Sequence, residues 1–163
     1  MKVAVTIAVL FGILAVVLSV IVGVTDYFIS RDTGAWLQRA QVAAQADDML
    51  YYLKQADAGL SKWHYENGYA AIIFKTPWNN ADMDRETISQ AINRTETINL
   101  MDRSGVAYQA GMDDVRGIIR EIEIAPVYFY FIHPMFVLVF ISMIISWIVT
   151  IGTVGYILVS ESW

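Results

Sequence analysis

The chain has 163 residues, 56% of them hydrophobic, with 11 basic residues, 16 acidic residues and no cysteine. The lack of cysteine excludes disulfides, thiolate nucleophiles and zinc, haem or iron–sulfur sites that use Cys ligands. The net charge of −5 disfavours nucleic acid and anionic lipid headgroups as partners, because both bind basic surfaces.

The charged residues avoid both ends of the chain. Outside residues 25–126 the only basic residue is Lys2 and the only acidic residue is Glu161. These two charges cancel, so the central segment carries the whole net charge. The pattern predicts four parts, which are a first transmembrane helix (1–25), a helical domain (26–126), an aromatic segment with a second transmembrane helix (127–159) and a short tail (160–163).

Residues 3–24 are 22 consecutive uncharged, mostly aliphatic residues. A helix of that length spans roughly 33 Å at ~1.5 Å per residue, enough for the ~30 Å hydrocarbon core. A cleaved signal peptide is the alternative, because a basic start and an apolar run also open such peptides. Their apolar region is typically about 7–15 residues long and precedes a small-residue cleavage site. This stretch is longer and lacks that site, so we expect an uncleaved anchor.

The second apolar run, residues 127–159, is longer than a bilayer requires. Residues 128–131 form an aromatic cluster typical of the headgroup region, and Pro134 disturbs a helix interior. We therefore predict a short interfacial segment followed by a span over residues 135–159. Tyr156 and Trp163 then mark the opposite interface.

The orientation prediction rests on Lys2 and the amino terminus, the only positive charges outside the central segment. The positive-inside tendency places them in the cytoplasm, and two spans return the carboxyl terminus to that side. We expect an integral protein of a cytoplasmic-type membrane whose central domain lies outside, in the periplasm or extracellular space.

Small residues recur on one face of each predicted span. In lipid, helices that pack usually meet through such residues. They are Gly12, Ala15, Ser19 and Gly23 in the first span, and Ser142, Ser146, Thr150 and Thr153 in the second. We predict that these faces pack on each other or on a partner subunit, although small residues are also common in membrane helices generally. Neither span contains Asp, Glu, Lys or Arg, which disfavours a transporter or pump.

Helical periodicity in the central segment predicts a small antiparallel bundle. Residues 34–66 predict one uninterrupted helix, joined to the first span through residues 26–33. After the Asn67-Gly68 turn, we favour a short helix over residues 69–78, since an isolated strand would have no pairing partner. An N-cap loop at Asn79-Asn80 precedes a helix that ends at Ser104-Gly105. A last helix contains Val115, Ile118, Ile119 and Ile122 at helical spacing. The predicted fold class is an all-α membrane protein, two transmembrane helices flanking an extracytoplasmic antiparallel helical bundle.

Aromatic residues concentrate in residues 63–69, with Trp36, Tyr51 and Tyr52 upstream and Phe74 and Trp78 downstream. Such residues most often pack in the core of a small bundle. The functional hypothesis is a docking surface, because Trp and Tyr are enriched at binding hot spots. The candidates for that surface are Trp63, Tyr65, Tyr69 and Trp78.

The two histidines differ in context. His64 and Glu66 stand two residues apart, so they point to different helix faces, and with no second histidine nearby in the sequence we expect no metal site. His133 precedes Pro134 at the predicted membrane boundary. We expect it to cap freed carbonyls or contact a partner, with ligation of a partner-held pigment or haem as the alternative. The chain is expected to hold no cofactor of its own beyond lipid.

No arrangement of residues predicts catalysis. The acidic pairs Asp47-Asp48 and Asp113-Asp114 diverge on a helix, and the chain has no glycine-rich phosphate loop, nucleophile elbow or zinc-protease motif. Asn93 begins a glycosylation triplet, but it lies in a predicted helix interior. We expect no catalytic residue.

Two function hypotheses follow. In the first, the chain is a non-catalytic accessory subunit of a larger membrane complex, of respiratory, photosynthetic or oxygenase type, whose partners are other membrane subunits and the bilayer. In the second, it is a receptor-like, ligand-sensing module. Only four residues follow the second span, too few for an output domain, so a receptor would need a separate signalling partner. We therefore expect the accessory role.

Overall fold

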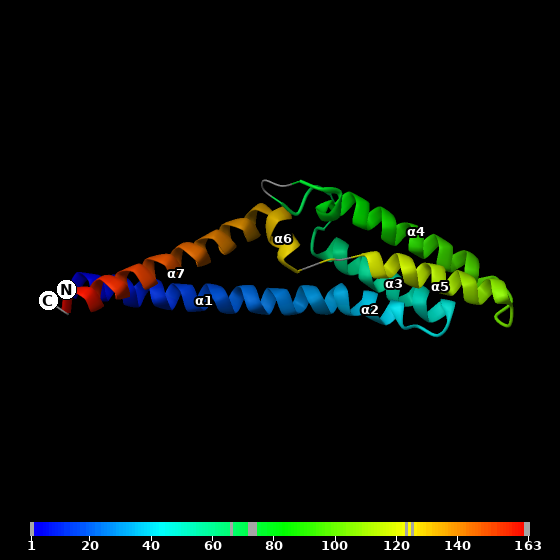
Figure 1. Cartoon of the computed structure of the whole chain (residues 1–163), viewed down its shortest axis with the longest axis horizontal. Coiled ribbons are helices and arrows are strands. Elements are labelled where there is room, and N and C mark those ends of the chain that lie inside the picture. Colours follow the sequence, from blue (N-terminus) through cyan, green and yellow to red (C-terminus); the bar gives the residue numbers. More distant parts are fainter. Residues whose placement is uncertain (1, 66, 72–74, 123, 125, 162–163) are drawn as a thin grey trace. The chain divides into compact units, whose positions relative to one another are not determined.

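The computed structural model describes residues 2–65, 67–71, 75–122, 124 and 126–161. Within these residues the chain is helical and contains no strand. The elements are α1 (Lys2–Asp32), α2 (Gly34–Gln41), α3 (Ala46–Lys62), the 3-10 helix η1 (Pro77–Asn79), α4 (Ala81–Asn99), α5 (Val106–Glu121), α6 (Pro126–Ile132) and α7 (Pro134–Glu161) (Figure 1).

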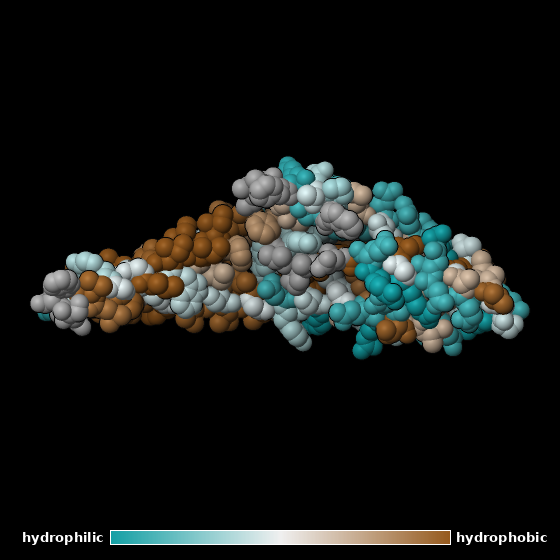
Figure 2. All heavy atoms as spheres, viewed as in Figure 1, coloured by the Kyte–Doolittle hydropathy of each residue, from teal (hydrophilic) through white to brown (hydrophobic). Residues whose placement is uncertain are grey.

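The chain divides into two compact units. The apolar unit comprises Met1–Asp26 and Pro134–Trp163, and the helical domain comprises Tyr27–His133. Helices α1 and α7 are long and apolar enough to cross a membrane, which confirms the expectation of two helices of spanning length. Hydrophobic residues gather over these helices and hydrophilic residues over the helical domain (Figure 2).

Large aliphatic side chains on α1 and α7 are exposed. Leu10 and Ile13 on α1 are 61% and 60% exposed, and Leu138 and Ile148 on α7 are 62% and 64% exposed. A surface of this kind is stable in hydrocarbon and costly in water, since each exposed apolar group favours transfer out of water.

The helix predicted over residues 34–66 is in fact two helices. α1 continues to Asp32 and α2 follows after Thr33, as expected, but residues 42–45 leave the helix before α3 begins. Two hydrogen bonds between this turn and side chains of α5 hold the turn in place. Arg116 donates to the Ala43 carbonyl at 2.7 Å, and the Ala46 N–H donates to the Tyr108 hydroxyl at 2.8 Å. These bonds satisfy backbone groups that a continuous helix would have satisfied itself, so the chain can fold back and α2 can pack on α3.

In the described part of the range 69–78, the predicted helix is wrong for residues 69–71 and 75–76, while residues 77–78 belong to the 3-10 helix η1. Tyr69 forms an isolated antiparallel bridge with Asn80, and the Ala70 N–H donates to the Asn79 carbonyl at 2.7 Å. Gly68 takes a positive φ of 95° at the turn before it, a conformation that glycine adopts at little cost. The expectation failed because the extended segment does have a pairing partner, which lies just before α4. Residues 72–74 lie outside the described residues.

The helix predicted to end at Ser104-Gly105 ends earlier, at Asn99, and Gly105 is instead the N-cap of α5, but two other predictions agree with the structure. The Asn80 side chain accepts a hydrogen bond from the Asp82 N–H at 3.0 Å, which makes it the N-cap of α4. The expected break at Pro134 is confirmed, because α6 ends at Ile132 and α7 begins at Pro134. Proline lacks an N–H and restricts the residue before it, so His133 interrupts the helix.

Helices α2, α3, α4 and α5 form the core of the helical domain. Each contacts the next along the chain, and α2 also contacts α5, so the four helices close on one another. The core side chains are apolar and fully or almost fully buried, and include Leu37, Met49, Leu53, Leu60, Ile88, Ala91, Met112 and Val115. Burial of such a core is the main favourable term in the stability of the domain.

Candidate functional site

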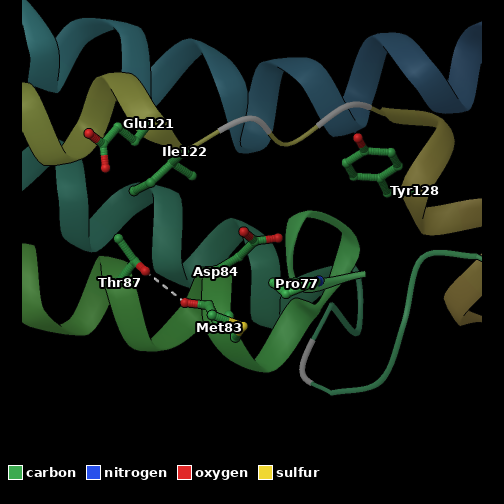
Figure 3. Close-up of a pocket in the computed structure, with 7 residues that line it drawn as sticks. All are labelled: Pro77, Met83, Asp84, Thr87, Glu121, Ile122 and Tyr128. Carbon is green, nitrogen blue, oxygen red and sulfur yellow. Dashed lines mark hydrogen bonds between the residues drawn. The ribbon is translucent and has the colours of Figure 1, made fainter. Parts of the chain in front are cut away.

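The helical domain contains an open pocket of about 450 Å³, within the size range of small-molecule sites. Met83, Asp84 and Thr87 line it from the first turns of α4, and Glu121 and Ile122 line it from the end of α5 (Figure 3). Pro77 of η1 and Tyr128 of α6 complete it. The amino end of α4 and the carboxyl end of α5 meet here because the two helices pack side by side with opposite directions.

Asp84 is the half-buried carboxylate of the pocket. Its Oδ2 accepts a hydrogen bond from the Tyr65 hydroxyl at 2.7 Å. Burial raises the pKa of Asp84, and the hydrogen bond from Tyr65 only partly opposes this effect. Burial and the neighbouring carboxylate raise the pKa of Tyr65 far above its usual value. Tyr65 therefore stays protonated at neutral pH and acts as a fixed donor.

Glu121 is an exposed carboxylate at the edge of the same pocket, at the last position of α5. The carboxyl end of a helix carries partial negative charge, which disfavours an anion and favours a cation nearby. Among the described residues, neither Glu121 nor Asp84 forms an ion pair. The two carboxylates thus place negative charge beside apolar walls, and the partial positive charge at the amino end of α4 opposes this charge only in part.

The four aromatic residues predicted to form a docking surface occupy different environments. Tyr65 is completely buried and packs against Phe129, with ring centroids 4.7 Å apart, so it is a core residue. Trp63 is half-buried and donates from Nε1 to Asp32 at 3.3 Å. Tyr69 is 38% exposed. Trp78 belongs to η1, and its side chain lies outside the described residues.

A second aromatic cluster is formed by Trp36 of α2 with Tyr51 and Tyr52 of α3. The centroid of the Trp36 ring lies 6.2 Å from that of Tyr51 and 6.0 Å from that of Tyr52. The centroids of the two tyrosine rings are 5.6 Å apart. Tyr51 is 54% exposed, and the Arg39 guanidinium lies 5.9 Å from the Trp36 ring centroid. We name this set the aromatic patch. The sequence shows these residues only as aromatic positions upstream of residues 63–69, and their contact depends on the turn at residues 42–45, which brings α2 onto α3 and was not predicted.

Several of the predicted small-residue positions meet inside the apolar unit. The Trp147 Nε1 donates to the Ser19 hydroxyl at 3.0 Å. A Cβ atom placed on Gly12 would lie 3.6 Å from Thr150 Cγ2. Ala15 and Ser146 are buried.

The other three predicted positions show no contact between α1 and α7 among the described residues. A Cβ on Gly23 would have no neighbour within 4 Å among the described residues. Ser142 is exposed, and its carbonyl accepts from Ser146. Thr153 donates to the Val149 carbonyl of its own helix at 2.6 Å.

The two histidines lie next to each other in the helical domain, with ring centroids 5.9 Å apart. The sequence does not predict this contact, because His64 and His133 are 69 positions apart in the chain. The described residues contain no group of three or more His, Cys, Asp or Glu side chains that could hold a metal ion. Glu66 lies outside the described residues, and ligation of a partner-held cofactor by His133 stays a prediction.

Comparison with protein-family models, with curated proteins and with solved structures finds no match for this chain. The function is therefore inferred from the residues of this chain alone.

Proposed function

We propose that this protein is a non-catalytic accessory subunit of a larger membrane complex. In this role α1 and α7 span the bilayer, both termini are cytoplasmic, and the helical domain lies outside and covers a partner. The observation that carries the proposal is the aromatic patch, Trp36, Tyr51 and Tyr52 with Arg39 beside them. Trp, Tyr and Arg are the residue types that dominate the binding energy of protein interfaces.

The geometry of the aromatic patch suits a binding surface. Trp36 stacks on Tyr52 at an interplanar angle of 23°, and Tyr51 packs edge-on against both rings. Rings that restrain one another lose little conformational freedom when a partner binds, which lowers the entropic cost of association. The exposed half of Tyr51 offers apolar area together with a hydroxyl that can form a hydrogen bond.

The apolar unit supports the same role. Ser19 and Trp147 join α1 to α7, while large aliphatic side chains such as Leu10 and Leu138 are exposed. These side chains can contact either lipid or the helices of neighbouring subunits. Lys2 at the amino terminus supports the proposed orientation, since basic residues favour the cytoplasmic side.

The proposal is tested by purification from native membranes in mild detergent, followed by native gel separation and mass spectrometry. We expect stoichiometric migration with a larger multi-subunit assembly, and a shift to the free chain in Trp36→Ala and Tyr51→Ala. Tyr27→Ala is the matched control, because Tyr27 is 63% exposed and lies outside the aromatic patch. Migration of the wild-type chain alone or as a small homo-oligomer would contradict the proposal.

A second candidate function is a ligand-sensing module that acts with a signalling partner. The pocket between α4 and α5 favours it, because its volume of about 450 Å³ fits a small organic molecule. This role requires that pocket variants change the ligand response without changing assembly, whereas the accessory role requires that variants of the aromatic patch change assembly.

A further inference from the structure

We infer that the pocket between α4 and α5 binds a small organic amine in its protonated form, with an apolar group next to the ammonium. This inference does not depend on the accessory role. It assigns a ligand class to the pocket on which the second candidate function rests.

The pocket is rich in negative charge. The pocket holds the carboxylates of Asp84 and Glu121, and the arginines adjacent to them in the chain do not line it. Arg85 pairs with Asp57 at 3.0 Å, and Arg120 lines a different cavity, beside α2. Two carboxylates without a paired cation among the described residues create a negative potential that concentrates cations.

The pocket also has an apolar wall. Met83, Ile122 and Pro77 line the pocket, and Tyr128 adds an aromatic ring (Figure 3). In the figure Glu121 and Ile122 lie on one side of Asp84, and Pro77 and Tyr128 lie on the other. A Ca²⁺ or Mg²⁺ ion needs about six or more oxygen ligands, counting water, and gains nothing from apolar contacts. An organic amine uses both surfaces, because its ammonium binds carboxylates and its apolar group binds the wall.

The Asp84 carboxylate is held in a fixed position. The Tyr65 hydroxyl donates a hydrogen bond to Oδ2 of Asp84. The Tyr65 ring is itself held in place, because it is completely buried and packs against Phe129. Oδ1 accepts no hydrogen bond from any described residue, so it is available to an ammonium donor. A carboxylate held in place loses less freedom on binding, and its partial burial strengthens the interaction with a cation.

The experiment uses the full chain in nanodiscs of zwitterionic lipid and measures binding by isothermal titration calorimetry. The probes are 2-phenylethylamine, the neutral 2-phenylethanol of similar shape and the anionic 3-phenylpropanoate. We expect the amine to bind at least ~10-fold more tightly than the alcohol, because an ammonium–carboxylate hydrogen bond is about twice as strong as a neutral one. The anion is expected not to bind.

The variants separate the pocket from general charge effects. We expect Asp84→Asn to weaken amine binding at least ~10-fold and Glu121→Gln to weaken it a few-fold, because Glu121 is more exposed. Glu86→Gln is the matched control, since Glu86 lies on α4, is exposed and does not line the pocket. It removes the same charge and is expected to leave the affinity unchanged.

Three results would overturn the inference. The first is that the amine and the alcohol bind with equal affinity. The second is that folded Asp84→Asn and Glu121→Gln bind the amine as tightly as the wild-type chain does. The third is that the amine shows no measurable binding at millimolar concentration. If Asp84→Asn fails to fold, Glu121→Gln decides, because its side chain is exposed. Failure here leaves the migration test of the accessory role unaffected, and failure of that test leaves the binding result unaffected.

Discussion

The Tyr65 hydroxyl lies 2.7 Å from Oδ2 of Asp84, so a completely buried ring just after α3 holds the central carboxylate of the pocket on α4. The two residues are 19 positions apart in the chain. The bond links the core of the helical domain to its candidate binding site. A substitution at Tyr65 is therefore expected to change the pocket through Asp84, although Tyr65 itself does not line the pocket.

Tyr65→Phe removes that donor and keeps the ring. We expect a loss of about 1–2 kcal/mol in the free energy of unfolding, because a hydrogen bond to a half-buried carboxylate is lost. The pKa of Asp84 should rise further, since the bond stabilises its charged form. Thermal unfolding and an NMR titration of Asp84 measure the two effects. An unchanged pKa would show that the bond is not formed in solution. Tyr69→Phe is the control, because Tyr69 is partly exposed and does not contact Asp84.

The raised pKa of Asp84 also predicts a pH dependence of stability. The folded state holds the Asp84 proton more tightly than the unfolded state, so the contribution of this group is fully present below the unfolded pKa of about 3.9. It is lost as the pH rises through the raised folded pKa. Asp84→Asn does not titrate, so its melting temperature relative to wild type should increase between pH 4 and pH 7. A difference that stays constant over this range would contradict the assignment. The comparison isolates Asp84 from Asp32 and Asp102, whose pKa values are lowered.

Gly59 allows α3 to approach the end of α1 closely. A Cβ at this position would lie 1.8 Å from the Asp32 carbonyl oxygen, and a backbone atom cannot move aside cheaply. We expect Gly59→Ala to destabilise the domain by about 3 kcal/mol or more, through overpacking. Gly117→Ala in α5 is the control, because no described atom lies within 4 Å of its built Cβ. Higher helix propensity should make that variant neutral or up to about 1 kcal/mol more stable. Equal melting temperatures for both variants would refute the close approach.

The contact between α1 and α7 can be tested by cross-linking, since the chain has no native cysteine. Gly12→Cys combined with Thr150→Cys should form a disulfide within one chain under mild oxidation, because a Cβ on Gly12 lies 3.6 Å from Thr150 Cγ2. Gly12→Cys combined with Leu158→Cys is the control, as Leu158 is 64% exposed. The measurement is gel mobility before and after reduction. Cross-links only between chains would indicate that the small-residue faces pack on another subunit.

Local features of the sequence predicted a large part of the fold. The two uncharged runs predicted two helices of spanning length, Asn80 predicted the start of α4, and Pro134 predicted the break before α7. These predictions succeeded because apolar length, N-cap hydrogen bonding and the missing proline N–H act within a few residues. Tertiary contacts can seldom override them.

The candidate sites depended on contacts that no local pattern contains. The turn between α2 and α3 is held by Tyr108 and Arg116, which lie 62 and 73 positions from their partners. That turn creates the aromatic patch, and the packing of α4 on α5 brings Asp84 and Glu121 to one pocket. Sequence periodicity indicates which face of a helix is buried, but not which helix covers it. Those choices follow from hydrogen bonds and close packing between distant segments, which exist only once the chain has folded.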